Sequence, residues 1–128
     1  MTKILIVDDD QRLLTLYSSI LRREGFEVLT ASDARKGHAL AVSAQPGLIL
    51  LDVMMPKIDG GDALGRLGED ASTKGIPVIF LTSLVKEAEV DAGGGKIGGQ
   101  SYISKSTPMP KFVATVKEAL SHTARKTS

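Results

Sequence analysis

Short, continuously apolar runs that recur between helix-like segments are the feature that most constrains how this chain folds. In the runs at 4–7 (ILIV), 48–51 (LILL) and 77–81 (PVIFL), apolar residues stand at consecutive positions instead of alternate ones. Strands of this kind need cover on both faces, which a parallel sheet between two layers of helices provides. Two further runs, at 27–31 (EVLTA) and 101–104 (SYIS), complete a set of five predicted strands.

Segments with helical spacing separate these runs. The first places apolar residues at intervals of three and four, at Leu13, Leu16, Tyr17, Ile20 and Leu21. Gly25 suits the end of this helix, and Asp33 suits the start of a second one that stops before Pro46. The other three helices are predicted around 61–67, from residue 84 and from Thr107. Strand and helix therefore alternate five times, which predicts a doubly wound α/β sandwich.

Size and charge narrow the function classes. The 128 residues suit one domain, and the net charge of +1 is too small to predict binding to nucleic acid or to membranes by bulk electrostatics. Aromatic residues make up only 4%, which leaves no platform for stacking on bases. The first residues do not have the pattern of a signal peptide. A membrane-spanning helix needs about 18 consecutive apolar residues, and every apolar stretch in this sequence is much shorter. We therefore expect a cytoplasmic protein without direct nucleic-acid or membrane binding.

Polar side chains follow four of the predicted strands, namely Asp8, Asp9 and Asp10, then Asp52, then Thr82 and Ser83, and finally Lys105. In a parallel sheet these positions share one edge. Carboxylates gathered there repel each other unless a cation is present, and hard oxygen ligands favour Mg²⁺ or Mn²⁺ over zinc. A divalent metal, a lysine and a hydroxyl around a carboxylate are the parts that phosphoryl transfer needs, with the carboxylate able to act as acceptor.

The motifs at these strand ends resemble a known family. KILIVDDD, LLDVMMPKIDG, IFLTS and SYISK are similar, in order and spacing, to the signatures of the receiver domain of two-component response regulators. The resemblance covers about residues 3–120 and is to chemotaxis-regulator-like single-domain receivers. It implies a flavodoxin-like (βα)5 fold with a five-stranded parallel sheet in the order 2-1-3-4-5. The receiver domain is then expected at 1–122, followed by a short basic tail at 123–128.

The resemblance also implies roles for single residues. Asp52 would be the phosphoacceptor that takes a phosphoryl group from a phosphohistidine. Asp8, Asp9 and Asp52, together with the backbone carbonyl of Met54, would bind Mg²⁺, with Mn²⁺ as an alternative. Lys105 would neutralise a phosphoryl oxygen. Asp10 is expected to serve only as an acid at the start of the first helix.

A phosphorylation switch follows from the same resemblance. Thr82 would move inward to bind the phosphoryl group, and the ring of Tyr102 would fill the space it leaves, which changes the face built from helix 4, strand 5 and helix 5. The implied partners are a sensor histidine kinase or histidine phosphotransfer protein and a downstream protein target, and a phosphorylation-dependent homodimer is allowed. The chemistry is limited to self-phosphorylation and self-dephosphorylation, so the protein is not expected to be an enzyme.

Three alternative hypotheses compete with this interpretation. A receiver-like binding module that is never phosphorylated would lack an acid or the lysine, and none is missing. An aspartyl phosphatase needs a second acid two residues after Asp52, where this chain has Met54. We expect a stand-alone receiver, but a receiver cut from a longer DNA-binding regulator or hybrid kinase stays open.

Two departures from the family pattern carry predictions of their own. Ser106 follows Lys105 where the family usually has a proline, so the cis or trans state of that bond is left open. GGGKIG at 93–98 matches a dinucleotide-binding pattern, but it follows a helix-like segment and precedes a strand, the reverse of what such a site needs. We therefore predict no nucleotide site, and we expect the glycines at 93–99 to loosen this segment.

Overall fold

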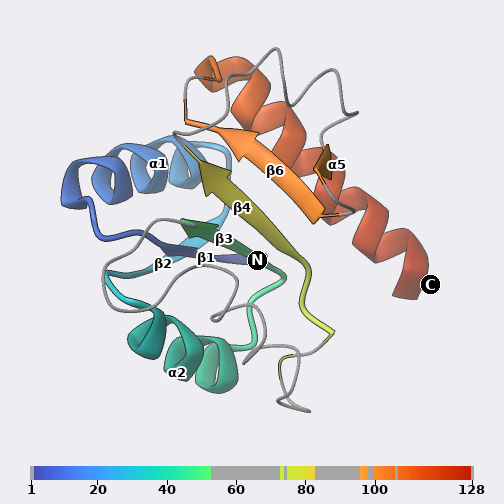
Figure 1. Ribbon diagram of the computed structural model, residues 1–128. Helices are drawn as coiled ribbons and strands as arrows, with labels where there is room; N and C mark the ends of the chain where they lie inside the picture. Colours follow the sequence, from blue (N-terminus) through green and yellow to red (C-terminus); the bar gives the residue numbers. More distant parts are fainter. Residues whose placement is uncertain are drawn as a thin grey trace.

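A sheet of parallel strands with helices on both faces forms the centre of the molecule, seen in a computed structural model (Figure 1). The structure describes residues 2–52, 73, 75–82, 96–97, 100–105 and 107–127. The strands are β1 Lys3–Val7, β2 Glu27–Ala31, β3 Leu48–Asp52, β4 Val78–Thr82, β5 Lys96–Ile97 and β6 Gln100–Ser104. The helices are α1 Gln11–Arg23, α2 Ala34–Ala44 and α5 Met109–Thr127. The helices predicted around 61–67 and from residue 84 lie outside the described residues.

The order of the strands confirms the predicted fold. The parallel strands lie in the order β2-β1-β3-β4-β6, which is the predicted 2-1-3-4-5. The short strand β5 was not predicted, and it pairs antiparallel with β6 through Lys96 opposite Ser101 and Ile97 opposite Gln100. It lies inside the glycine run, of which residues 93–95 and 98–99 fall outside the described part, so the predicted mobility of this segment stays a prediction.

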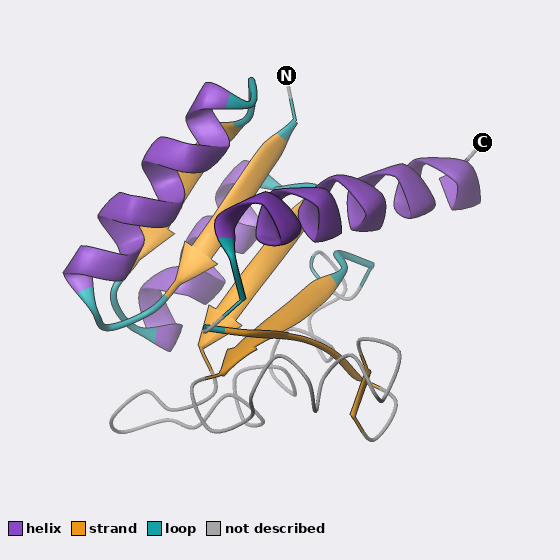
Figure 2. Cartoon of the chain, turned by 90° about the horizontal axis from the view of Figure 1, so that it is seen from above, coloured by secondary structure: helices purple, strands orange, loops and turns teal. Residues whose placement is uncertain are grey.

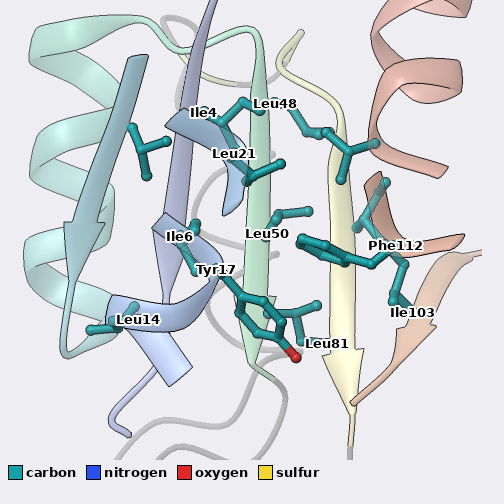
Figure 3. Close-up of a cluster of buried hydrophobic side chains, with 13 residues drawn as sticks. Ile4, Ile6, Leu14, Tyr17, Leu21, Leu48, Leu50, Leu81, Ile103 and Phe112 are labelled. Carbon is teal, nitrogen blue, oxygen red and sulfur yellow. The ribbon is translucent and has the colours of Figure 1, made fainter. Parts of the chain in front are cut away.

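Two hydrophobic clusters fill the spaces between the sheet and its helices. Helices α1 and α5 cover one face, and α2 lies on the other (Figures 1 and 2). Alternate residues of each central strand enter opposite clusters, as when Ile4 and Ile6 face α1 and α5 (Figure 3) while Leu5 and Val7 face α2. All four of these side chains are at most 2% exposed. Burial on both faces explains why the runs are continuously apolar.

Local signals place the helix ends where the sequence predicts them. Asp10 caps α1 by accepting a hydrogen bond from the Arg12 N–H at 2.9 Å, and Asp33 caps α2 by accepting one from the Lys36 N–H at 2.8 Å. Gly25 follows the end of α1 with a φ of 92°, a left-handed conformation that glycine adopts without steric cost. The predicted N-terminal role of Asp10 is therefore confirmed.

The predicted apolar face of α1 is wrong at one position. Leu16 is 44% exposed, whereas Leu14 and Ser18 are buried with Tyr17 and Leu21. The cause is the position of α1, which contacts both β2 and α5. The buried side of the helix is therefore rotated by about one residue relative to the predicted side. Helical periodicity fixes the width of an apolar stripe better than its exact direction.

Helix α5 begins one residue after Pro108 and continues to Thr127. Residues 123–127, which were expected in a short basic tail, are therefore helical, and the domain boundary at 122 stays a prediction. Lys117 forms an ion pair with Glu24 at 2.5 Å, which joins α5 to the residue that ends α1. Among the helices that the structure describes, none is long and apolar enough to cross a membrane.

Close packing of α2 on β1 gives a first test of the fold. A Cβ atom added to Gly37 would lie 2.7 Å from Cγ2 of Val7. The Gly37→Ala variant should lower the free energy of unfolding by about 1 kcal/mol, because overpacking costs about 1–3 kcal/mol and the gain in helix propensity is at most about 1 kcal/mol. Urea unfolding measures this change.

Gly75→Ala is the matched control for this substitution, because a methyl group there meets nothing within 4 Å. This variant should keep or slightly raise the stability of the parent. If Gly37→Ala is as stable as the parent, then α2 moves away from β1 without cost and the close contact does not limit the packing.

Candidate functional site at the strand ends

The ends of four parallel strands hold the side chains that the sequence singles out. Asp8 directly follows β1, Asp52 ends β3, Thr82 ends β4 and Lys105 directly follows β6. Asp8 is 0% exposed, and Asp52 and Thr82 are also buried. Because the strands are parallel, their ends lie at the same edge of the sheet (Figure 2). The site is thus built from residues far apart in the sequence.

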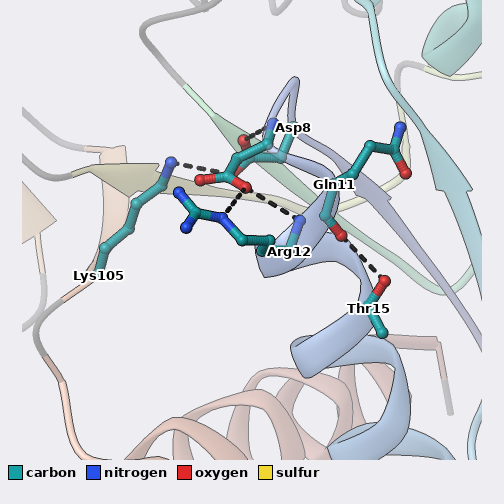
Figure 4. A network of polar contacts seen from close by, with 6 residues as sticks. Asp8, Gln11, Arg12, Thr15 and Lys105 are labelled. Carbon is teal, nitrogen blue, oxygen red and sulfur yellow. Dashed lines mark hydrogen bonds and ion pairs between the residues drawn. The ribbon is translucent and has the colours of Figure 1, made fainter.

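Lys105 is the cation at the centre of this edge. Its Nζ lies 2.9 Å from Oδ2 of Asp8 (Figure 4) and 3.4 Å from Oδ2 of Asp52. Its backbone N–H donates to the carbonyl oxygen of Thr82 at 2.7 Å, which fixes where the side chain starts. Burial lowers the pKa of Lys105, but the Asp8 and Asp52 carboxylates more than offset this and raise it above its ordinary value. The ammonium group is therefore charged at neutral pH.

Three carboxylates gather beside this lysine. Asp8, Asp9 and Asp52 each offer an oxygen, and these oxygens lie within 4.8 Å of one another. Asp9 is exposed while the other two are buried, so the cluster opens to solvent on one side. This donor set of hard oxygens fits Mg²⁺ or Mn²⁺. Met54, whose backbone carbonyl was predicted as a further ligand, lies outside the described residues.

Asp10 supports the site without joining the cluster. Its backbone N–H donates to Oδ1 of Asp8 at 2.9 Å, which holds that carboxylate in place. Its own side chain caps α1 and lies 3.7 Å from Nε of Arg12 (Figure 4). The start of α1 and the orientation of Asp8 therefore depend on the same residue.

Tyr17 is a residue that sequence reasoning placed only in an apolar stripe. Its ring is 2% exposed and stacks on Phe112, with ring centroids 4.7 Å apart. Its hydroxyl points in the direction in which β4 runs, toward the edge that holds the candidate site (Figure 3). Burial raises the pKa of Tyr17, and the charges of Lys105 and Asp8 also act on it. The only sign of this in the sequence was that a residue with a hydroxyl group stands among the aliphatic residues of the predicted apolar stripe.

The predicted switch residues lie on neighbouring strands. Phe80 is paired with Tyr102 and Thr82 with Ser104 in the register of β4 and β6. Tyr102 is half-buried, and its ring centroid lies 5.2 Å from that of Phe80. Their role in a switch stays a prediction, and the bond between Lys105 and Ser106 lies outside the described residues.

Comparison with known proteins decides what this arrangement belongs to. A family model described as the response regulator receiver domain matches residues 4–117. The chain belongs to the response regulator receiver family. Receiver domains are phosphoacceptor modules of two-component signal transduction that generally use Mg²⁺, so the predicted family and function class are confirmed. They interact with histidine kinases or phosphotransfer proteins and with downstream targets.

Relatives of this receiver domain include both long and short proteins. It is 40% identical to the DNA-binding dual master transcriptional regulator RpaA of Synechocystis over 98% of this chain, but it spans only 52% of the length of that regulator. It is 35% identical to the protein PilH of Pseudomonas aeruginosa over 94% of this chain and 98% of PilH. The chain thus spans about half the length of one relative and nearly all of the other.

Solved receiver structures have the same fold. The CheY-like receiver domain protein of Methanospirillum hungatei is 27% identical with a TM-score of 0.82, and 98% of each chain is covered. The chemotaxis protein CheY4 of Vibrio cholerae is 27% identical with a TM-score of 0.78, covering 93% of this chain and 98% of that one. The predicted resemblance to chemotaxis regulators is therefore confirmed at the level of fold.

Proposed function

We propose that Asp52 of this receiver domain accepts a phosphoryl group from a phosphohistidine of a sensor kinase or phosphotransfer protein. The observation that supports this most is the position of the Lys105 ammonium group, 2.9 Å from Asp8 and 3.4 Å from Asp52. Such a cation can neutralise charge on a phosphoryl group bound to Asp52. Phosphoryl transfer depends mainly on positioning and charge neutralisation of this kind.

The reaction follows from the chemistry of a carboxylate. An oxygen of Asp52 forms a bond to phosphorus while the phosphorus–nitrogen bond of the phosphohistidine breaks. The electron pair of that bond goes to the imidazole nitrogen, which then takes a proton from solvent. Attack of water on phosphorus later returns the free carboxylate and inorganic phosphate. Asp52 is thus a reactant that is regenerated, and the domain has no other catalytic activity in this proposal.

Asp8, Asp9 and Asp52, with the backbone carbonyl of Met54, would hold the Mg²⁺ ion, and Mn²⁺ would suit the same oxygens. Their fit rests on the three carboxylate oxygens that lie within 4.8 Å of one another. A bound divalent ion neutralises negative charge on phosphoryl oxygens. Within the protein, the Asp10 N–H keeps Asp8 oriented toward the cluster at 2.9 Å.

Thr82 and Tyr102 are proposed to transmit phosphorylation of Asp52 to the surface of the domain. Thr82 would hydrogen-bond a phosphoryl oxygen, and Tyr102 would then change its packing beside Phe80. The altered surface around β6 and α5 would bind a downstream protein target or a second copy of the chain. A cytoplasmic location completes the proposal.

The metal dependence of phosphorylation tests this proposal. Incubation with acetyl phosphate and Mg²⁺ should add one phosphoryl group, measured by intact mass, and removal of the metal with EDTA should stop it. Asp9→Asn should slow the reaction by at least about tenfold, because a charged ligand is lost. Asp10→Asn should react like the parent, because asparagine also caps helices well. Equal rates with Mg²⁺ and with EDTA would contradict the proposed metal site.

A further inference from the structure

A polar cleft on the far side of α1 from α5 has no part in the chemistry described so far. It lies between α1 and the edge strand β2, and its volume is about 190 Å³. Its polar lining consists of Gln11, Thr15, Ser18, Ser19, Arg22 and Thr30. None of the described residues that line the cleft is acidic, and none belongs to the candidate site at the strand ends. The cleft is therefore separate from the phosphorylation site and rich in hydrogen-bond donors.

Ser18 brings a buried hydroxyl to this cleft. The residue is 4% exposed, and its Oγ has no hydrogen-bond partner within the part of the chain that the structure describes. A helical serine or threonine usually bonds back to a carbonyl of the preceding turn, as Thr15 does with the Gln11 carbonyl at 2.9 Å. A buried hydroxyl without a partner is costly. Ser18 therefore lines the cleft with a hydroxyl that is itself buried and has no partner among the described residues.

Arg22 adds a positive charge one turn further along the same side of α1. One of its terminal nitrogens donates to the carbonyl oxygen of Val28 at 3.3 Å, which holds the guanidinium group beside β2. A guanidinium group has five N–H donors, so further ones can reach a ligand. Their planar arrangement matches the oxygens of a carboxylate or a phosphate. The hydroxyl-bearing residue Thr30 lines the cleft from β2.

We propose that the cleft between α1 and β2 binds a small oxyanion, a carboxylate or a phosphate, through the guanidinium group of Arg22 and the buried hydroxyl of Ser18. The small volume limits the guest, because pockets for drug-sized ligands are about 300–1,000 Å³. The guest is therefore a single oxyanion group with few attached atoms. A water molecule that bonds to Ser18 is the competing occupant, and it needs neither Arg22 nor an anion.

Titration of the full chain followed by amide NMR tests this site. Inorganic phosphate, and in a second series acetate, is added at constant ionic strength without Mg²⁺. Saturable shifts are expected for the amides of Ser18, Arg22 and Thr30. Arg22→Ala should weaken binding at least about tenfold, the loss of about 1.4 kcal/mol expected when a charge-assisted contact is removed. The acetate and phosphate series show which of the two oxyanions the cleft prefers.

Arg23→Ala is the matched control, because Arg23 is the exposed neighbour with the same charge and does not line the cleft. It should bind the anion as the parent does. Ser18→Ala should bind more weakly, although loss of the unpaired hydroxyl keeps or raises its stability without ligand. The proposal is overturned by an absence of saturable shifts, by equal weakening in both arginine variants, or by unchanged binding in Ser18→Ala.

Discussion

Asp52→Asn is expected to abolish the uptake of a phosphoryl group from acetyl phosphate in the presence of Mg²⁺. An amide is not a nucleophile at neutral pH and cannot form an acyl phosphate, so the rate should fall by more than about a thousandfold, as when an enzyme loses its nucleophile. Asparagine is close in size to aspartate, and the residue is buried at the end of β3, so the fold should be kept. Intact mass measured over time gives the result directly.

Asp33→Asn is a suitable control for this experiment. It makes the same carboxylate-to-amide change at the N-cap of α2, where asparagine caps equally well, and it leaves the candidate site untouched. This variant should be phosphorylated like the parent. Labelling of Asp52→Asn at the rate of the parent, or peptide mapping that finds the phosphoryl group on another acid, would refute the assignment of Asp52.

Lys105→Met has the second-largest expected effect, this time on stability. Without the ammonium group, the buried Asp8 and Asp52 carboxylates lose the cation that they share. Breaking a buried ion pair by removing one partner costs about 3–5 kcal/mol. We expect the lower end, about 3 kcal/mol at pH 7 in urea unfolding, because 15% of the Lys105 side chain is exposed. Addition of Mg²⁺ should recover much of this loss, since a bound cation takes the place of the ammonium group.

The pH dependence of this difference follows from the raised pKa of Lys105. A group whose pKa is higher in the folded protein contributes stability that is fully present below its ordinary value of 10.5. That contribution is lost as the pH rises through the folded pKa. The gap between parent and Lys105→Met should therefore stay constant through neutral pH and close above pH 10.5. Lys36→Met, at an exposed position of α2, should match the parent throughout, and equal stability of Lys105→Met would contradict the ion-pair assignment.

Much of the fold was predictable because buried parallel strands have a distinct pattern. The run at 27–31 matches β2 at both ends, and the run at 48–51 falls one residue short of β3, which ends at the polar Asp52. Which side of α1 is buried was less predictable. Leu14 and Leu16 are equally apolar, and only the packing of the folded helix determines which of them is buried. Strand β5 has just two residues, and its pairing depends on β6 rather than on its own sequence.

The candidate site was predictable in its members but not in its internal pairing. The parallel strands and the family motifs predicted that Asp8, Asp52 and Lys105 lie close together, and in the structure they do. The sequence contained no sign that the ammonium group lies closer to Asp8 than to Asp52, because that depends on how the side chains pack in the folded protein. Nor did it indicate that Tyr17 extends its hydroxyl toward this edge.

Stacking of Tyr17 on Phe112 has a practical consequence. The chain contains no tryptophan and two tyrosines, so Tyr17 and Tyr102 dominate its intrinsic ultraviolet emission. Tyr17 lies under the sheet edge where the carboxylates gather, and Tyr102 lies on β6 beside Phe80. The charges at the strand ends therefore act on Tyr17, one of the protein's own chromophores. The fluorescence of the unmodified protein can report on the candidate site without any attached dye.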